Sequence, residues 1–319
     1  MRVVAVSVPG EADVLQIVER PTPEPPPFHV RVKVAAVGLN RADLLQRRGL
    51  YPAPAGTVPD VPGLEYTGVV DELGEGCTRF SAGDRVMGLV PGGAYSEAVV
   101  VHEREAMAVP SGLATIEAAA IPEAFMTAYD ALRALEMRAG QRLLIHAIGS
   151  GVGTAALQIA SWMGVHTVGS SRTATKLKRA QALGCDDVLL VDDPSAFAER
   201  IAPVDGVLDL VGGSYFEQSL ASLKARGRLL VVGLTAGVSA PCPLAMILRK
   251  RLMVLGTQLR SRPIEEKIAL ARDFETHVLP AMGTALNPVV DRSVPMQDVS
   301  DAHREMESNQ NFGKIVLTW

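Results

Sequence analysis

The chain has 319 residues, of which 48% are hydrophobic and 4% aromatic, and its formal net charge is −4. This length exceeds what one hydrophobic core usually organises, so we expect two domains, and the apolar content argues against a disordered chain. No long run of basic residues occurs, so nucleic acid is not an expected partner. The cysteines Cys77, Cys185 and Cys242 lie far apart, which argues against a disulfide framework or a cysteine-based zinc site.

The first apolar run, from Arg2 to Val8, is too short for the core of a signal peptide and predicts a strand. Two uncharged stretches, 143–171 and 229–248, are interrupted by Gly or Pro, whereas a membrane helix would be continuous. We therefore expect a cytoplasmic protein that does not contact the membrane.

Residues 1–118 have the pattern of a β-rich domain. Val30–Val34 alternates apolar with charged residues, the period of a half-buried strand. Turn dipeptides such as Pro62-Gly63 and Pro91-Gly92 recur between such short runs.

Helical periodicity appears at 116–134, and strands then alternate with helices. The expected strands are Arg142–Ala147, His166–Ser170, Asp187–Val191, Gly206–Val211 and Arg228–Leu234, with a sixth apolar run at Leu252–Leu259. This alternation predicts a doubly wound parallel sheet, a Rossmann domain over 119–261. One intervening helix is expected to begin at Asp193-Pro194, and another to be capped by Ser214.

The last segment, 262–319, predicts helices at Ile264–Val278 and Val299–Glu307 and a strand at Lys314–Thr318. Because so short a segment could not fold alone, we expect it to complete the N-terminal domain.

A glycine-rich turn follows the first Rossmann strand and opens an alanine-rich helix. Its candidate cofactor residues are Gly149, Ser150, Gly151, Val152 and Gly153. Glycine lets the backbone approach a pyrophosphate, and the free N–H groups of the helix start would hold the anion. The match to G-x-G-x-x-G is incomplete, because Thr154 stands at the third glycine.

The end of the second Rossmann strand predicts which cofactor binds. NAD sites usually have a carboxylate there for the ribose hydroxyls. This chain has Ser171, Arg172 and Lys176 instead, and an arginine can bind a 2′-phosphate through two hydrogen bonds. The sequence therefore favours NADPH.

Five stretches together resemble one family: Gly38–Arg47, Ile121–Ala128, Ser150–Ala156, Gly212–Tyr215 and Asn311–Val316. Over nearly its whole length the chain resembles the zinc-independent medium-chain dehydrogenase/reductases of the quinone oxidoreductase (zeta-crystallin-like) family. It is most similar to their apoptosis-associated quinone oxidoreductase subgroup. The resemblance implies a GroES-like catalytic domain, a cleft between the domains with the nicotinamide at its floor, and a homodimer joined along Leu252–Leu259.

The residues at the metal positions of the related zinc alcohol dehydrogenases predict no metal site. Asn40 and Leu64 replace a cysteine and a histidine ligand, and Glu123 falls near the third ligand. An amide, a leucine and a lone carboxylate do not make a zinc site, so hydrogen bonds must activate the substrate.

The resemblance implies that Asn40, Asp43 and Tyr51 line the substrate site. Tyr51 would donate a hydrogen bond or a proton to a carbonyl oxygen, and Asn40 would be a second donor. For Asp43, a structural role in its loop is the alternative.

The resemblance also extends the cofactor site to Thr127, Gly233, Leu234, Leu259 and Asn311. In one respect the chain departs from its relatives: Val191-Asp192-Asp193 stands where they often have Asn-Tyr-Lys at the adenine end. The preference for NADPH over NADH is therefore open.

The leading hypothesis is an NADPH-dependent quinone oxidoreductase acting on a small molecule. Two alternatives stay open: an NADPH-dependent 2-alkenal or enoyl reductase, and an NADPH-binding protein with a non-catalytic or RNA-binding role.

Overall fold

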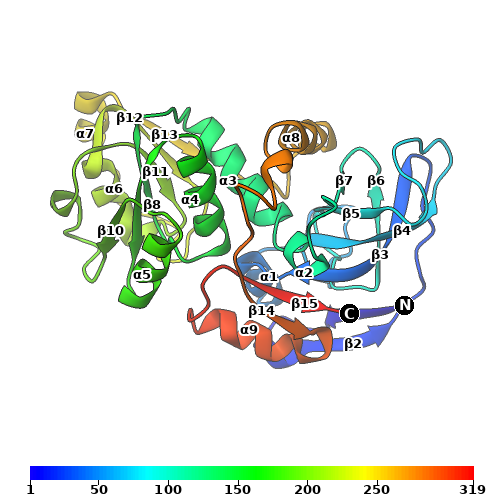
Figure 1. Ribbon diagram of the computed structural model, residues 1–319. Helices are drawn as coiled ribbons and strands as arrows, with labels where there is room; N and C mark the ends of the chain where they lie inside the picture. The colour runs from blue at the N-terminus through cyan, green and yellow to red at the C-terminus, as the bar shows by residue number, and fades with distance from the viewer. The chain divides into compact units, whose positions relative to one another are not determined.

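The computed structural model describes all residues, 1–319, and divides into two compact units (Figure 1). Unit 1 comprises Met1–Met126 and Leu259–Trp319, and unit 2 comprises Thr127–Gln258. None of the helices combines the length and the apolar character that a membrane span needs.

Unit 1 is built on a seven-stranded sheet with the order β14-β15-β3-β4-β5-β7, in which β6 also pairs with β3. Its strands are β3 (His29–Gly38), β4 (Glu65–Leu73), β5 (Arg85–Leu89), β6 (Ala98–His102), β7 (Met107–Ala108), β14 (Val290–Pro295) and β15 (Lys314–Thr318). The predicted alternation places Val30, Val32 and Val34 in the core. A separate antiparallel pair joins β1 (Arg2–Val6) and β2 (Leu15–Glu19).

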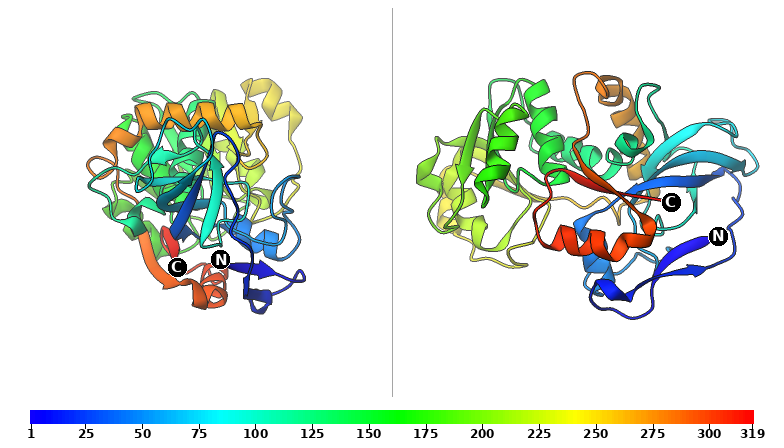
Figure 2. Two further views of the ribbon diagram at one scale, coloured as in Figure 1. Left: turned by 90° about the vertical axis from the view of Figure 1, so that its right-hand side faces the viewer. Right: turned by 60° about the horizontal axis from the view of Figure 1, so that its bottom comes forward.

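The C-terminal segment adds two strands to this sheet. Strand β15 pairs antiparallel with β3, with Val316 opposite Gly38, and β14 pairs parallel with β15. Figure 2 shows the red strand β15 alongside the blue strand β3. This pairing brings Leu39 and Lys314, which are 275 positions apart in sequence, into contact.

The helices of unit 1 range from 4 residues in α2 to 14 residues in α8. They are α1 (Arg41–Arg47), α2 (Thr115–Ala118), the first turn of α3 (Pro122–Ala134), α8 (Ile264–His277) and α9 (Val299–Glu307). The single helix predicted for 116–134 is divided into α2 and α3, because Pro122 begins a new helix, a position where its missing N–H costs nothing.

Unit 2 contains a six-stranded parallel sheet with the order β10-β9-β8-β11-β12-β13. The strands are β8 (Arg142–Ile145), β9 (His166–Ser171), β10 (Asp187–Leu190), β11 (Val204–Asp209), β12 (Leu223–Val231) and β13 (Met253–Gly256). The strand order reverses between β8 and β11, and in doubly wound sheets ligands bind outside the carboxyl ends of the strands at such a point. The predicted fold class is therefore confirmed.

The helices of unit 2 besides α3 are α4 (Gly151–Trp162), α5 (Ala174–Ala182), α6 (Phe216–Ser222) and α7 (Leu244–Lys250). The α-helix predicted from Asp193-Pro194 is wrong: only a 3-10 turn forms, at Ala198–Arg200. The Asp193 carboxylate instead accepts hydrogen bonds from the Ser195 N–H and hydroxyl, a local turn that competes with a helix.

The predicted capping by Ser214 is also wrong. Gly212 and Gly213 have φ values of 66° and 53°, so a 3-10 turn at Gly213–Tyr215 precedes α6. The residue before the first α-helical residue is consequently Tyr215.

Candidate cofactor and substrate sites

The glycine-rich turn connects the buried strand β8 to α4. Ser150 is the N-cap of α4, and its hydroxyl accepts a hydrogen bond from the Gly153 N–H at 3.0 Å. The first turn of α4 contains no acidic side chain, so the positive end of the helix dipole is not neutralised by the protein. Such a helix start binds anions.

Glycine is required within this turn. A Cβ on Gly153 would lie 2.5 Å from the Ala147 carbonyl oxygen and 2.9 Å from that of Ile148, so even alanine would displace the backbone. Ala147 has a left-handed φ of 48°, which for a residue with a side chain costs roughly 1–3 kcal/mol. Gly149 is buried, whereas Gly151 and Val152 are partly exposed at the start of α4.

Arg172 follows the end of β9 directly and is exposed. It makes no ion pair, but its charge acts on Tyr215, whose phenol pKa burial raises and Arg172 lowers. Ser171 ends the strand, and its hydroxyl accepts a hydrogen bond from the Thr173 N–H at 3.1 Å. Lys176, partly exposed, lies in the first turn of α5.

The remaining predicted cofactor residues fall in both units. In unit 2, Gly233 lies so close to Leu210 that a Cβ would be 2.4 Å from its carbonyl oxygen, and Leu234 is 49% exposed. Thr127, on α3, is buried, and its hydroxyl has no hydrogen-bond partner. Leu259 and Asn311 are buried in unit 1, where the Asn311 amide donates to the Gly313 carbonyl at 2.9 Å.

Asp209 is a residue of this region that the sequence did not single out. One of its carboxylate oxygens accepts hydrogen bonds from Val211 N–H and Gly212 N–H, and the other is buried without a partner. It ends β11, the strand beside β8 where the strand order reverses. Buried polar atoms without partners are rare in proteins, so Asp209 and Thr127 both fit positions that a polar ligand approaches.

The polar cluster of unit 1 centres on Glu65, which is fully buried. Its Oε1 accepts from the Lys314 ammonium at 2.6 Å and from the Asn40 amide at 2.9 Å. The ammonium also donates to Asn40 Oδ1 at 2.6 Å and to the Leu39 carbonyl at 2.9 Å. Because the Asn40 amide also donates to the Gly38 carbonyl, both its hydrogens are engaged inside the protein.

Asp43 is fully buried at the start of α1. Its carboxylate accepts from Asn40 N–H at 2.8 Å, Gly63 N–H at 3.1 Å and the Tyr95 hydroxyl at 3.2 Å. Burial raises the pKa of Asp43 to about 6, against the opposing effect of these hydrogen bonds. These contacts support the structural interpretation of Asp43.

Tyr51 lies in the segment after α1, and Arg260 holds that segment in place. The Arg260 guanidinium lies 4.7 Å from the centre of the Tyr51 ring and donates to the Tyr51 carbonyl at 3.0 Å. The same group donates to the Pro91 carbonyl at 2.6 Å. Arg260 was not predicted, because its partners are distant in sequence.

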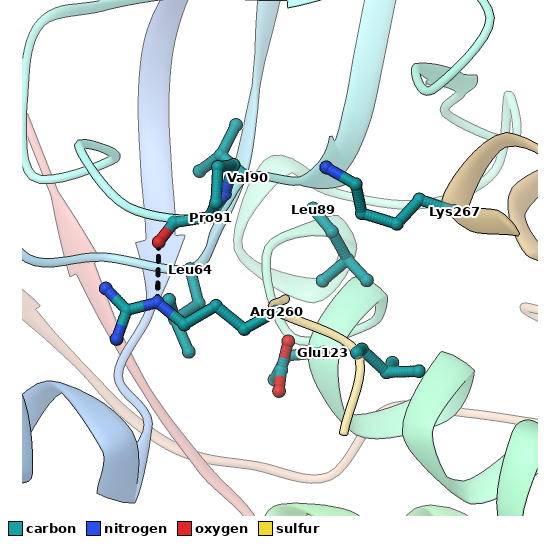
Figure 3. A pocket seen from close by; sticks show the side chains of 8 residues that line it. Leu64, Leu89, Val90, Pro91, Glu123, Arg260 and Lys267 are labelled. Carbon is teal, nitrogen blue, oxygen red and sulfur yellow. Dashed lines mark hydrogen bonds between the residues drawn. The ribbon is translucent and has the colours of Figure 1, made fainter. Parts of the chain in front are cut away.

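A small pocket of unit 1 lies beside this arginine (Figure 3). It is lined by Leu64, Leu89, Val90, Pro91, Glu123, Leu259, Arg260 and Lys267. Its volume is about 10 Å³, room for one water molecule.

Glu123 contributes the one carboxyl group of this pocket. It lies in the first turn of α3, and its N–H donates to Glu65 Oε2 at 2.8 Å. Its own carboxyl group makes no hydrogen bond. Burial and the charge of Glu65 raise the pKa of Glu123 to about 8, although Lys314 and Arg260 act in the opposite direction.

Of the side chains at the metal positions, Asn40 belongs to the hydrogen-bonded cluster around the Lys314 ammonium, whereas Leu64 is apolar and the Glu123 carboxyl group makes no hydrogen bond. The structure contains no group of three or more His, Cys, Asp or Glu side chains placed to hold a metal ion. The Lys314 ammonium supplies the positive charge that Glu65 needs.

A β domain completed by the C-terminal segment, together with a doubly wound parallel sheet, defines a class of two-domain dehydrogenases and reductases. Two protein families that match parts of the chain agree with this class. Residues 26–111 match the "Alcohol dehydrogenase GroES-like domain" and residues 151–276 match the "Zinc-binding dehydrogenase" family.

Similar proteins include a quinone oxidoreductase from Pseudomonas aeruginosa, 30% identical over 97% of this chain and 96% of that protein. A synaptic vesicle membrane protein VAT-1 homolog from Rattus norvegicus is 31% identical over 97% of this chain and 81% of its own length. The polyketide synthase GfsB from Streptomyces halstedii is 33% identical over 98% of this chain, but the chain spans only 6% of that protein.

Solved structures agree. The Escherichia coli quinone oxidoreductase complexed with NADPH is 27% identical, with a TM-score of 0.88 and complete coverage of both chains, 100% and 100%. The CurK enoyl reductase is 26% identical, with a TM-score of 0.88 over 99% of this chain and 98% of that one. The chain belongs to the quinone oxidoreductase-like group of the medium-chain dehydrogenase/reductase family.

Proposed function

We propose that this protein is an NADPH-dependent oxidoreductase that reduces a quinone. The observation that carries the cofactor has two parts: the first turn of α4 contains no acidic side chain, and Arg172, just after the end of β9, makes no ion pair. The first fits a pyrophosphate, and the second fits a 2′-phosphate. The quinone is supported by relatives such as the Pseudomonas aeruginosa quinone oxidoreductase.

The predicted cofactor residues can be assigned to the successive parts of NADPH. Gly149, Ser150, Gly151, Val152 and Gly153 would surround the pyrophosphate, and Ser171, Arg172 and Lys176 the phosphorylated ribose. Thr127, Gly233 and Leu234, with Leu259 and Asn311, would contact the nicotinamide half. NADPH supplies a hydride, which is two electrons and one hydrogen.

The contribution of unit 1 is to stabilise the negative charge that the hydride brings to the substrate. Tyr51 is the proposed hydrogen-bond donor, since Arg260 fixes the position of its ring. Asn40 would serve as a second donor by exchanging one of its two internal hydrogen bonds. Asp43 would act by holding the start of α1, which carries Asn40 as its N-cap.

A second candidate is an enoyl or 2-alkenal reductase. The similarity to the CurK enoyl reductase and to a segment of a polyketide synthase favours it. The same cofactor and the same proton donors would serve, but the hydride would go to the β-carbon of the substrate.

We propose in addition that the protein is a homodimer joined along β13. This strand is at the edge of the sheet of unit 2, and Met253 and Val254 are 46% and 41% exposed. An exposed apolar edge strand tends to pair with another chain. Sedimentation of the V254K variant tests this: a monomer is expected, and an unchanged mass would contradict it.

The proposed function is tested by NADPH oxidation at 340 nm, with an ortho-quinone and a 2-alkenal in parallel. Turnover of the quinone supports the first candidate, and turnover of the alkenal alone supports the second. Binding of NADPH without turnover of either would contradict both and favour a non-catalytic role. The Y51F variant should lower kcat about 10-fold or more if the phenol donates to the substrate, with unchanged affinity for NADPH.

A further inference from the structure

The pocket of unit 1 combines an unpaired carboxyl group with an apolar wall. Leu64, Leu89, Val90 and Leu259 form that wall, and Glu123 is the acidic residue that lines it. In Figure 3 the Glu123 carboxyl group lies next to the aliphatic part of Arg260, and both residues line the pocket. A carboxyl group that is partly removed from water and receives no hydrogen bond favours its neutral, protonated form.

Both acidic and basic side chains lie near Glu123, and they act on its pKa in opposite directions. Glu65 on β4 and Asp43 on α1 favour protonation, whereas Lys314 on β15 and Arg260 oppose it. Two of these groups are largely neutralised by each other, because the Lys314 ammonium is 2.6 Å from Glu65 Oε1. Lys267 on α8 also lines the pocket, but its ammonium pairs with Glu105 at 3.0 Å.

The guanidinium of Arg260 is likewise engaged away from Glu123. It donates to the carbonyls of Pro91 and Tyr51 and to the side chain of Gln46. None of the cations around the pocket is therefore bonded to Glu123 itself. Burial and the nearby acids prevail, which raises its pKa to about 8.

A second unpartnered group lies one helical turn further along α3. Thr127 follows Glu123 by four residues, so both side chains are on one face of the helix. The Thr127 hydroxyl is buried without a hydrogen-bond partner. A buried polar atom without a partner, such as the Thr127 hydroxyl oxygen, fits a position that a polar ligand approaches.

We infer that Glu123 is the proton donor of the reaction and holds in its carboxyl group the proton that the reduced substrate takes up. This inference rests on the proposed reduction of a quinone. Hydride transfer adds two electrons and one hydrogen to the quinone and leaves a hydroquinone monoanion. The O–H bond of Glu123 then breaks, its proton passes to the anionic oxygen, and solvent returns a proton to the carboxylate.

The reaction needs an acid that can release a proton at neutral pH, and Glu123 fits this requirement. An acid is most effective when its pKa is close to the working pH, because it is then both protonated and ready to release its proton. Glu123, with a pKa of about 8, meets this condition. Tyr51 would then act as the hydrogen-bond donor to the substrate, and Glu123 as the source of the proton.

The test compares the wild type with E123Q and E123D in two measurements. The first is an NMR titration of protein labelled with ¹³C in the glutamate carboxyl groups. One carboxyl group should titrate near pH 8, and this signal should be absent from E123Q. Titration of every glutamate in the ordinary range would overturn the inference without any assay of activity.

The second measurement is the dependence of kcat on pH with a quinone. In the wild type kcat should fall above about pH 8, where Glu123 loses its proton. E123Q should lose about 100-fold in kcat, the lower end for general acid catalysis, and lose this pH dependence. E123D, which withdraws the carboxyl group by one methylene, should keep the pH dependence at an intermediate rate.

The control is E117Q, the same change at a glutamate on α2 whose carboxylate accepts from Ala114 N–H. It should leave kcat and the pH profile unchanged. Equal rates and profiles for E123Q and the wild type would overturn the proton-donor role and leave the proposed function intact. If the wild type itself reduces neither acceptor, the proposed function fails and the donor role fails with it.

Discussion

The turn before α4 presents main-chain groups of consecutive residues, whereas the polar cluster of unit 1 is assembled from three separate segments. In the turn, Ser150 and Gly153 are three residues apart and determine each other's geometry through one hydrogen bond. In the cluster, Asn40, Glu65 and Lys314 meet only because β3, β4 and β15 pair in one sheet. A site of the first kind loses its function when a single backbone position is altered. A site of the second kind loses the stability of its domain as well.

The largest expected effect is a loss of stability when the polar cluster around Glu65 is broken. K314M removes the only cation bonded to Glu65, which is fully buried. Removing one partner of a buried ion pair costs about 3–5 kcal/mol, because the other charge is left without compensation. Urea unfolding should show this loss in the free energy of unfolding.

The matched control is K224M, which breaks an ion pair at the surface. Lys224 lies 2.8 Å from Asp205, and its side chain is 43% exposed. Pairs of this kind contribute about 1 kcal/mol or less. If both variants lost the same stability, the buried ion pair of Lys314 and Glu65 would stabilise the domain no more than a surface pair does.

The second largest expected effect is a loss of NADPH binding at the glycine-rich turn without a loss of folding. G151V places a branched side chain at the first residue of α4, where the pyrophosphate would approach the backbone. We expect NADPH to bind at least about 100-fold more weakly, by fluorescence titration, in a protein that still unfolds cooperatively.

The control for this variant is G112V, since Gly112 has open space around its Cβ position and no left-handed φ. It should bind NADPH like the wild type. Undiminished binding by G151V would show that the cofactor does not use this turn.

A third effect concerns the 2′-phosphate. R172A removes a charged donor without an internal partner, so the loss should fall on the cofactor alone. A charge-assisted hydrogen bond contributes about 1.5–3 kcal/mol, which corresponds to a KM for NADPH that rises roughly 10- to 100-fold. The KM for NADH should change little, and K178A, at an exposed lysine of α5, should change neither. An equal rise for both cofactors would contradict a contact with the 2′-phosphate.

The difference between the two sites also explains which features could be predicted from the sequence and which could not. The parallel sheet and the glycine-rich turn follow from local patterns, since strand, turn and helix are consecutive. The resemblance placed Asn40, Asp43 and Tyr51 in unit 1, but not their contacts. Glu65 and Arg260 carry no local signal, because their partners are brought close only by the fold.

The wrong and missing predictions arise because contacts in the folded chain override or add to the local pattern. Asp193-Pro194 has the composition of a helix start, but the Asp193 carboxylate bonds to Ser195 and forms a turn. Glu123 was noticed only as an unsuitable metal ligand. Its raised pKa depends on burial and on Glu65, which lies 58 residues earlier in the chain.

The smallest effect is on stability as a function of pH. A carboxyl group whose pKa is raised in the folded protein binds its proton more tightly there than in the unfolded chain. The free energy of unfolding of the wild type should therefore fall as the pH rises from the ordinary value, 4.5, toward about 8. E123Q should lack this component, so its stability should exceed that of the wild type more at pH 9 than at pH 5.

Partial exposure of Glu123 and solvent screening make this difference smaller than the loss in K314M. Urea unfolding at the two pH values measures it. Parallel pH profiles for E123Q and the wild type would contradict a raised pKa.

We propose above all that NADPH bound to unit 2 is consumed by reduction of a quinone. A single-turnover experiment tests it most directly: protein preloaded with one equivalent of NADPH is mixed with an ortho-quinone, and absorbance at 340 nm is followed. One equivalent of NADPH should be lost and one equivalent of hydroquinone should form. Bound NADPH that persists in the presence of the quinone, but is consumed when a 2-alkenal is added, would contradict it.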